Sequence, residues 1–296
     1  MEEKGFEKLE RTIENLLVKM IIRVTTNIPP DVLKAIRKAK MQETSELAKT
    51  QFELILDNFE YGCKNKVPIC QDTGVLNFFI RIGNLFPIIS NYRKIINKAV
   101  IRATEIIPLR GNSVHPLTNQ NPENNIGLNY PPIYLDIVDG SENLKIDILA
   151  KGGGAENISK LFMLNPSNGL KEFPQKVIEV IKNASGMPCP PIILGIGIGG
   201  DATKCMLLAK KALLRPLNEK NSDRDIAKLE EKLLNKINSL NIGPMGLGGN
   251  TTCLGVNIEI AMRHPASYPV GMIVQCYCHR LSSIEISKRG EIINES

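Results

Sequence analysis

The stretch PPIILGIGIGGDATKCMLLAKKALL, residues 190–214, decides the fold class. Two prolines precede a short apolar segment rich in isoleucine, which is typical of a buried strand. A run of glycines at 195–200 follows, and the apolar residues after it recur with a helical period. The stretch therefore predicts a strand, a glycine-rich turn and a helix, as expected in a protein that mixes both kinds of element.

The flanking sequence repeats this mixture. Helices are expected where apolar residues form one stripe, at 6–24, in NIPPDVLKAIRKA from residue 27, and at 44–59, 91–107, 171–184 and 224–240. Strands are expected at 75–83, in IYLDIV and LKIDILAK on either side of DGSEN, in VGMIVQC, and in a terminal hairpin that turns at Arg289-Gly290. The predicted class is mixed α/β of the α+β type. A helical N-terminal segment of about 1–62 would precede a mixed-sheet lobe covered by helices at about 63–296, in one catalytic domain of 296 residues.

Composition argues against several classes of protein. The N-terminus is charged and lacks the order of a secretory signal, and no apolar run approaches the roughly 18–20 residues that span a bilayer. The net charge of +6 comes from 37 basic and 31 acidic residues that are interleaved along the chain. Such a pattern is weak evidence for nucleic acid, although the excess could favour small anions. We expect a cytoplasmic protein with neither a membrane nor a nucleic-acid partner.

The cysteines do not form a secreted disulfide framework, because their number is odd and they are widely spread. They are Cys63, Cys70, Cys189, Cys205, Cys253, Cys276 and Cys278. Cys70, Cys189 and Cys276 fall at expected element boundaries beside polar or rigid neighbours, whereas Cys205 falls inside an expected helix. Each thiol is either a small buried apolar group or a metal ligand. Cys276-x-Cys278 is a poor zinc pattern, and a cluster built from distant segments suits these thiols better.

Two glycine clusters leave alternatives open. The run at 195–200 fits the G-x-G-x-x-G template of a dinucleotide-binding oxidoreductase, but Glu219, the acid near the required distance, follows no apolar strand. A tight turn with close helix packing explains the same glycines. The second cluster, 152–154, could form an anion-binding concavity with Lys151 and Asn157 nearby, or be a flexible loop. A nicotinamide-dependent enzyme and a non-catalytic anion-binding module therefore remain as alternatives from other classes.

Seven ordered motifs carry a more specific signal. They are PICQDTG, IPLRGNS, KGGGAEN, CPPIILGIGIGG, GPMGLGGNTTCLGV, RHPASYPVGM and CYCHR. In this order they resemble the class I, iron–sulfur-dependent fumarate hydratases and their relatives, the L-tartrate dehydratases. The resemblance is to the α subunit, or equivalently to the N-terminal catalytic portion of single-chain forms, and it covers nearly the whole chain.

The resemblance implies a [4Fe–4S] cluster held by three cysteines, with one iron left without a protein ligand. Matched by motif, the ligands are Cys70, Cys189 and Cys276. The other four cysteines fall outside the family pattern. An open iron suits a hydration reaction, because a Lewis acid can bind a carboxylate and a hydroxyl together and stabilise departing hydroxide.

The resemblance also implies roles for residues that would contact substrate. Gln71 donates to a carboxylate, and Asp72 acts in proton transfer or orients the hydroxyl. Arg110 matches an arginine that clamps a carboxylate, a task suited to the guanidinium fork. His264 matches a histidine that contacts substrate and takes a catalytic role, and Gly153 matches a glycine whose backbone approaches the substrate. Without the resemblance, Arg110 could be a surface loop residue and His264 a structural histidine.

The implied activity is reversible hydration of fumarate to L-malate, and the sequence of the KGGGAEN motif favours this substrate. Dehydration of L-tartrate to oxaloacetate is the alternative. The full-length family enzymes carry a second portion that supplies further parts of the site, including the expected base. We therefore expect a separate β subunit, a small dicarboxylate substrate bound at the α–β boundary, and an (αβ)2 assembly.

Overall fold

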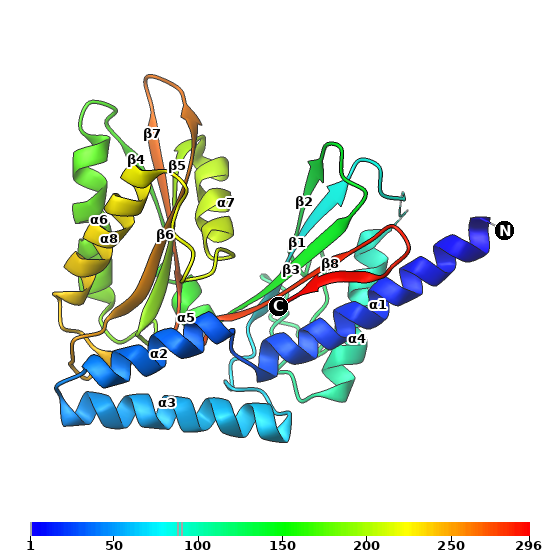
Figure 1. Cartoon of the computed structure of the whole chain (residues 1–296), viewed down its shortest axis with the longest axis horizontal. Coiled ribbons are helices and arrows are strands. Elements are labelled where there is room, and N and C mark those ends of the chain that lie inside the picture. The colour runs from blue at the N-terminus through cyan, green and yellow to red at the C-terminus, as the bar shows by residue number, and fades with distance from the viewer. Residues whose placement is uncertain (1, 88, 90) are drawn as a thin grey trace. The chain divides into compact units, whose positions relative to one another are not determined.

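The computed structural model describes residues 2–87, 89 and 91–296, and its backbone forms helices and two mixed sheets (Figure 1). Unit 1, the first of two compact units, comprises Met1–Pro29, Phe59–Lys151 and Arg280–Ser296. Unit 2 comprises Pro30–Asn58 and Gly152–His279. The α+β class is confirmed, including the helical N-terminal segment.

Unit 1 is built on a five-stranded sheet with the order β2-β1-β3-β8-β9. Its elements are α1 (Glu2–Thr26), β1 (Val75–Gly83), α4 (Tyr92–Ile106), β2 (Ile133–Val138), β3 (Leu144–Lys151), β8 (Arg280–Ile286) and β9 (Ile292–Glu295). β1 pairs in parallel with β2 and antiparallel with β3, so the two strands that flank DGSEN lie on either side of β1. β8 and β9 form the expected terminal hairpin.

The core of unit 1 lies between this sheet and α1 and α4. Alternate residues of the strands, such as Phe78, Ile80 and Ile146, are buried together with Ile21 of α1 and Val100 of α4. This arrangement follows from sequence, because a strand places every second side chain on one face and an amphipathic helix presents one apolar stripe.

Unit 2 contains a four-stranded sheet with the order β4-β7-β5-β6. Its elements are α2 (Pro30–Gln42), α3 (Glu46–Asn65, which continues into unit 1), α5 (Gly153–Glu156), β4 (Lys160–Leu164), α6 (Gly169–Ala184), β5 (Ile192–Gly200), α7 (Ala202–Ala212), α8 (Arg224–Asn238), the short 3-10 helix η1 (Pro244–Gly246), β6 (Cys253–Arg263) and β7 (Tyr268–Gln275). Figure 1 shows α6 and α8 on one side of this sheet and α7 on the other. The strands β4 and β6 were not predicted. No helix of the described residues meets the length and hydropathy that a bilayer span requires.

The glycine run belongs largely to a strand. Gly195 and Gly197 lie inside β5 and face α7, where an added Cβ would come within 2.1 Å of the Ala209 carbonyl oxygen and 2.0 Å of the Cys205 carbonyl oxygen. Only glycine allows the helix to approach the strand this closely. The prediction of close helix packing is therefore confirmed.

The dinucleotide interpretation is wrong. It requires the first glycines to form the turn that receives the pyrophosphate, whereas here Gly195 and Gly197 lie inside β5, and the backbone takes a positive φ only at the end of the strand, at Gly199 (+92°) and Gly200 (+67°). Glu219 lies between α7 and α8, with no strand before it. Both features that the interpretation needs are missing from this part of the described chain.

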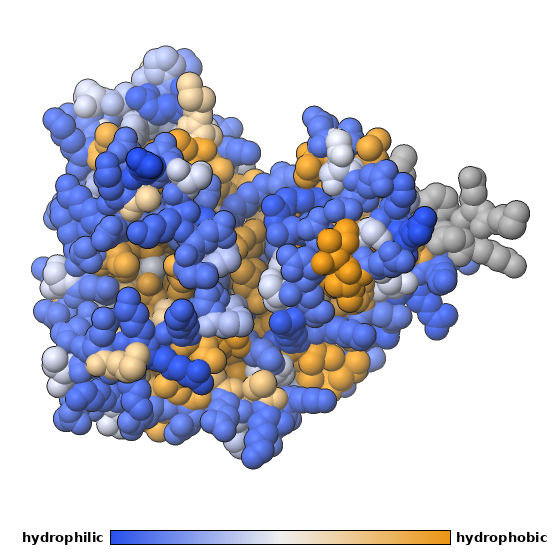
Figure 2. Space-filling view, viewed as in Figure 1, coloured by the Kyte–Doolittle hydropathy of each residue, from blue (hydrophilic) through white to orange (hydrophobic). Residues whose placement is uncertain are grey.

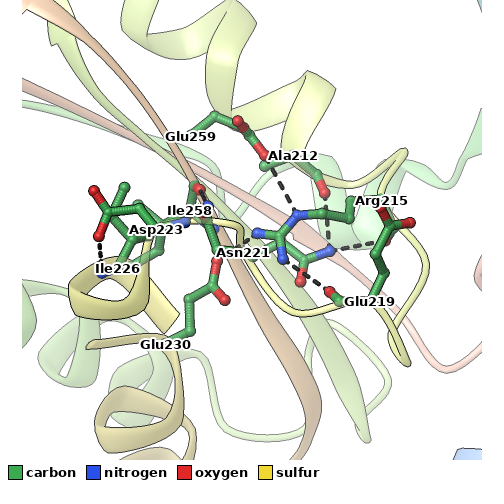
Figure 3. Close-up of polar contacts among 10 residues, drawn as sticks. Ala212, Arg215, Glu219, Asn221, Asp223, Ile226, Glu230, Ile258 and Glu259 are labelled. Atoms are coloured by element: carbon green, nitrogen blue, oxygen red, sulfur yellow. Dashed lines mark hydrogen bonds and ion pairs between the residues drawn. The ribbon is translucent and has the colours of Figure 1, made fainter. Parts of the chain in front are cut away.

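A buried ion-pair network joins the connection between α7 and α8 to the edge strand β6 (Figure 3). The Arg215 side chain, 13% exposed, pairs through Nη2 with Glu230 and through Nε with Glu259 at 3.4 Å, and its Nη1 donates to the Glu219 carbonyl at 3.0 Å. Glu230 Oε1 also accepts from the Ile258 amide at 2.7 Å. The network thus satisfies a backbone donor on the open side of β6.

Replacing Glu230 by alanine is expected to lower the free energy of unfolding of unit 2 by about 3 kcal/mol, because Arg215 would keep a buried charge without its principal partner. The matched control is Glu259→Ala, which removes the more exposed carboxylate of the same network and should cost roughly 1 kcal/mol or less. Urea unfolding followed by circular dichroism measures both. Equal effects of the two variants would contradict this account of the network.

Candidate active site

The segment from Cys70 to Gly74 forms a tight bend before β1 in unit 1. The Asp72 carboxylate oxygen Oδ1 accepts from the Gly74 amide at 3.0 Å, so the side chain closes an Asx-type turn. Gly74 has φ +82°, and an added Cβ would lie 2.9 Å from the Lys151 backbone nitrogen. The Asp-Thr-Gly sequence therefore sets the direction in which the preceding residues Cys70 and Gln71 enter the bend.

The backbone of Arg110 is hydrogen-bonded to this turn. Its amide donates to Thr73 Oγ1 at 3.2 Å. The Asn112 side-chain amide donates to the same hydroxyl at 3.1 Å and to the Gly74 carbonyl at 3.2 Å. The Arg110 side chain itself is exposed. Unit 1 therefore brings together four of the predicted site residues: Cys70, Gln71, Asp72 and Arg110.

The long polar segment that follows Arg110 is ordered against the turn through Tyr130. Tyr130 Oη donates to the Asn112 carbonyl at 3.0 Å. Burial, and secondarily the negative charge of Asp72, raises the pKa of Tyr130 to about 12. The phenol therefore stays protonated and keeps its donor role throughout the neutral range.

Arg280 is a residue that sequence reasoning missed. It is fully buried at the start of β8, and its Nη1 donates to the Asp72 carbonyl at 2.8 Å. The motif CYCHR contains it, but nothing local marks an arginine at the beginning of an alternating strand as part of a site. Its significance depends on a contact across 208 positions of the chain.

Cys189 and Cys276 lie close together in unit 2. Cys189 precedes β5 and adopts φ +52°, and Cys276 directly follows β7. Because β5 and β7 are antiparallel, with Ile193 opposite Gln275, the beginning of one strand and the end of the other share one end of the sheet. The Tyr277 amide donates to the Cys189 carbonyl at 3.2 Å, which joins the two segments directly.

The glycine cluster also reaches this end of unit 2. Gly153 begins the short helix α5, which contacts β7, and a Cβ on Gly154 would lie 3.4 Å from the Met187 carbonyl oxygen, two residues before Cys189. Gly153 therefore lies in the same neighbourhood as Cys189. Lys151 is a buried residue at the end of β3.

His264 lies at the opposite end of the same sheet. It occupies the exposed turn between β6 and β7, where its Nδ1 accepts from the Ala266 amide at 3.1 Å. The eight residues of β7 separate this turn from Cys276, a distance of roughly 23 Å along an extended strand. The structure does not bring His264 together with Cys189 and Cys276.

The seven thiols differ in exposure in a way that suits the predicted ligand set. Cys70, Cys189 and Cys276 are each partly exposed, whereas Cys63 is exposed and Cys205, Cys253 and Cys278 are buried. Burial raises the pKa of Cys253 to about 12 and also raises that of Cys205, which disfavours the thiolate that binds metal.

The donor set also fits the chemistry of an iron–sulfur cluster. No disulfide joins the cysteines of the described chain, and cysteine thiolates are the protein ligands of such clusters. Among the described residues, no group of three or more His, Cys, Asp or Glu side chains is placed to hold a single metal ion. The thiolates of a cluster bind different irons. The finding about single metal ions therefore does not apply to the predicted cluster ligands.

Comparison with known proteins agrees with the motifs. Residues 14–285 match the family described as Fumarate hydratase (Fumerase). A Methanocaldococcus jannaschii protein with the provisional name L(+)-tartrate dehydratase subunit alpha is 46% identical over 273 residues, which cover 90% of this chain and 95% of that protein. The L(+)-tartrate dehydratase subunit alpha of Escherichia coli K12 is 31% identical over 284 residues, covering 96% and 94%. The chain belongs to the fumarate hydratase (Fumerase) family, and it is an enzyme of the hydro-lyase class.

Proposed function

We propose that this chain is the α subunit of an iron–sulfur hydro-lyase that dehydrates L(+)-tartrate to oxaloacetate. The observation that carries the substrate is the similarity, at 46% and 31% identity over at least nine-tenths of the chain, to proteins named as tartrate dehydratase α subunits. The same names support a β-type partner, which completes the site.

Fumarate hydration is the second candidate. The description of the matching family and the sequence motif KGGGAEN favour fumarate as the substrate. The sequence motifs alone had placed fumarate first, and the named relatives reverse that preference. Both substrates are small dicarboxylates that need the same elements, a clamp for carboxylate and a group that handles a hydroxyl.

The proposed site uses Cys70, Cys189 and Cys276 as ligands of a [4Fe–4S] cluster. Two observations support this assignment. The three thiols are partly exposed, and a backbone hydrogen bond from Tyr277 to Cys189 joins the segments that contain Cys189 and Cys276. When bound, the cluster supplies an open iron that acts as a Lewis acid toward a substrate hydroxyl and carboxylate.

The polar residues of unit 1 would orient the substrate. The Gln71 amide donates to a substrate carboxylate, and the exposed Arg110 guanidinium pairs with a carboxylate in bidentate fashion. The Asp72 carboxylate, already oriented by the Gly74 amide, holds or transfers a proton at the substrate hydroxyl. The Gly153 backbone, at the start of α5, would approach the substrate, as the family resemblance implies.

The predicted catalytic role of His264 depends on how copies of the chain assemble. Within one chain, β7 separates this histidine from Cys276. A role for His264 in the same site therefore requires a second copy of the chain, which the expected (αβ)2 assembly would supply.

The chain co-expressed with its β-type partner and purified without oxygen should dehydrate L(+)-tartrate faster than it hydrates fumarate, and the α chain alone should show at most a few per cent of that activity. Iron and sulfide analysis should give cluster-level stoichiometry, and exposure to air should remove colour and activity together, because an open iron is accessible to oxygen.

The substrate panel and an air-exposed sample provide the controls. Faster turnover of fumarate would select the second candidate. Activity that is indifferent to air and to iron chelators would contradict both candidates.

A further inference from the structure

Arg280 is buried in a way that general stability does not explain. Its relative exposure is 0%, and Nη1 donates to the Asp72 carbonyl at 2.8 Å. Among the described residues, its Nε and Nη2 are buried without a hydrogen-bond partner, and no carboxylate lies within ion-pair distance. The buried carboxylate on the same sheet, Asp147, pairs with Arg81 at 3.1 Å instead.

Such a side chain costs stability. A buried guanidinium that keeps unsatisfied donors is less favourable than an apolar side chain of similar volume. Residues of this kind are tolerated where function needs them, because sites commonly break the rules that stabilise the rest of the fold. The hydrogen bond from its guanidinium to the Asp72 carbonyl indicates a function for Arg280 at the Asp72 turn.

The Arg280 guanidinium packs against the Asp72 turn and is held there by the strand that carries it. Arg280 lies opposite Ala150 in the β3–β8 ladder, so its backbone is fixed by strand pairing. Its Nη2 lies 3.0 Å from the position that a Cβ would take on Gly74, so the guanidinium lies directly against the turn. The glycine permits this contact, and the hydrogen bond to the Asp72 carbonyl then sets the position of that residue.

We propose that Arg280 is a positioning residue for Asp72, and this proposal rests on the proposed function. Arg280 fixes the main chain of the Asp72 turn and thereby the direction of the Asp72 carboxylate and of the adjacent Gln71. Because it is fully buried, it acts through the turn and does not contact substrate. Its positive charge also makes the surroundings of the turn more favourable for a dicarboxylate.

The test compares Arg280→Met and Arg280→Lys in the co-expressed, cluster-loaded complex. Methionine removes the charge and the hydrogen bond but keeps much of the volume. Arg280→Met should therefore leave the melting temperature unchanged or raise it, while kcat for L(+)-tartrate falls roughly 10- to 100-fold, as expected for a displaced catalytic group. KM should change less than kcat. Arg280→Lys, which keeps a donor, should recover part of the lost kcat.

Arg81→Met is the matched control. It removes another arginine of the same sheet, leaves the buried Asp147 without its partner, and should lower the melting temperature with wild-type kcat. A purely structural role for Arg280 predicts the same pattern as this control, that is, lost stability with retained turnover.

Hydrogen exchange gives a readout that does not depend on activity. Amides at 70–76 should exchange faster in Arg280→Met than in the wild type, with little change elsewhere in unit 1. If the wild-type complex turned over neither diacid, the proposed function would fail, and exchange at 70–76 would still decide the role of Arg280. Unchanged exchange, or unchanged kcat in an active complex, would overturn the proposal.

Discussion

Serine at Cys70, Cys189 or Cys276 is expected to remove at least about nine-tenths of the visible iron–sulfur absorbance of the anaerobically purified protein. A serine hydroxyl replaces a thiolate, and thiolates are the ligands that iron–sulfur clusters require. With only three protein ligands in the proposed set, the loss of any one leaves the cluster held by two. Visible spectra, together with iron and sulfide analysis, measure the effect.

The matched controls are the cysteines outside the proposed set. Cys63→Ser changes an exposed thiol near the end of α3, and Cys205→Ser changes a buried thiol inside α7. Both variants should retain the wild-type absorbance. If Cys63 or Cys278 proved necessary while one of the three proposed ligands did not, the ligand assignment would be wrong.

Asp72→Asn is expected to lower kcat by roughly 10³-fold, within the range attributed to general acid–base catalysis. The asparagine oxygen can still accept from the Gly74 amide, so the turn should persist. The carboxylate that would hold the transferred proton is lost. Cluster absorbance and melting temperature should therefore remain close to those of the wild type, which separates a chemical defect from a folding defect.

Asp139→Asn serves as the control for this variant. Asp139 is an exposed aspartate between β2 and β3, in the same unit, and its loss should leave kcat unchanged. A kcat for Asp72→Asn within threefold of the wild type would show that Asp72 only shapes the turn.

Local pattern predicted most of the secondary structure but not the pairing of strands. The segments 75–83 and 224–240 became β1 and α8 because period and length agree there with the buried faces. β6 was missed, since it is an edge strand whose second half leaves Ile260 and Met262 exposed and so lacks the signature of a buried strand. The order β2-β1-β3 depends on contacts between distant segments, which periodicity does not encode.

The site shows the same limit. Motifs placed Cys189 and Cys276 in one neighbourhood, and the antiparallel pairing of β5 and β7 explains why. His264 precedes β7 and Cys276 follows it, so the two residues lie at opposite ends of the sheet. A linear motif does not show this separation. Arg280 escaped prediction because its partner lies 208 positions away.

The interleaving of the two units bears on how the chain acquires its structure during synthesis. The sheet of unit 1 includes β8 and β9, so it stays incomplete on the ribosome until residues 280–295 have emerged. Unit 2 lies wholly before residue 280 and is free to fold first. The bend at Asp72, translated early, must therefore wait for Arg280 before it is held in place, and a nascent chain stalled before that point should carry a Cys70–Gly74 bend that lacks this hydrogen bond.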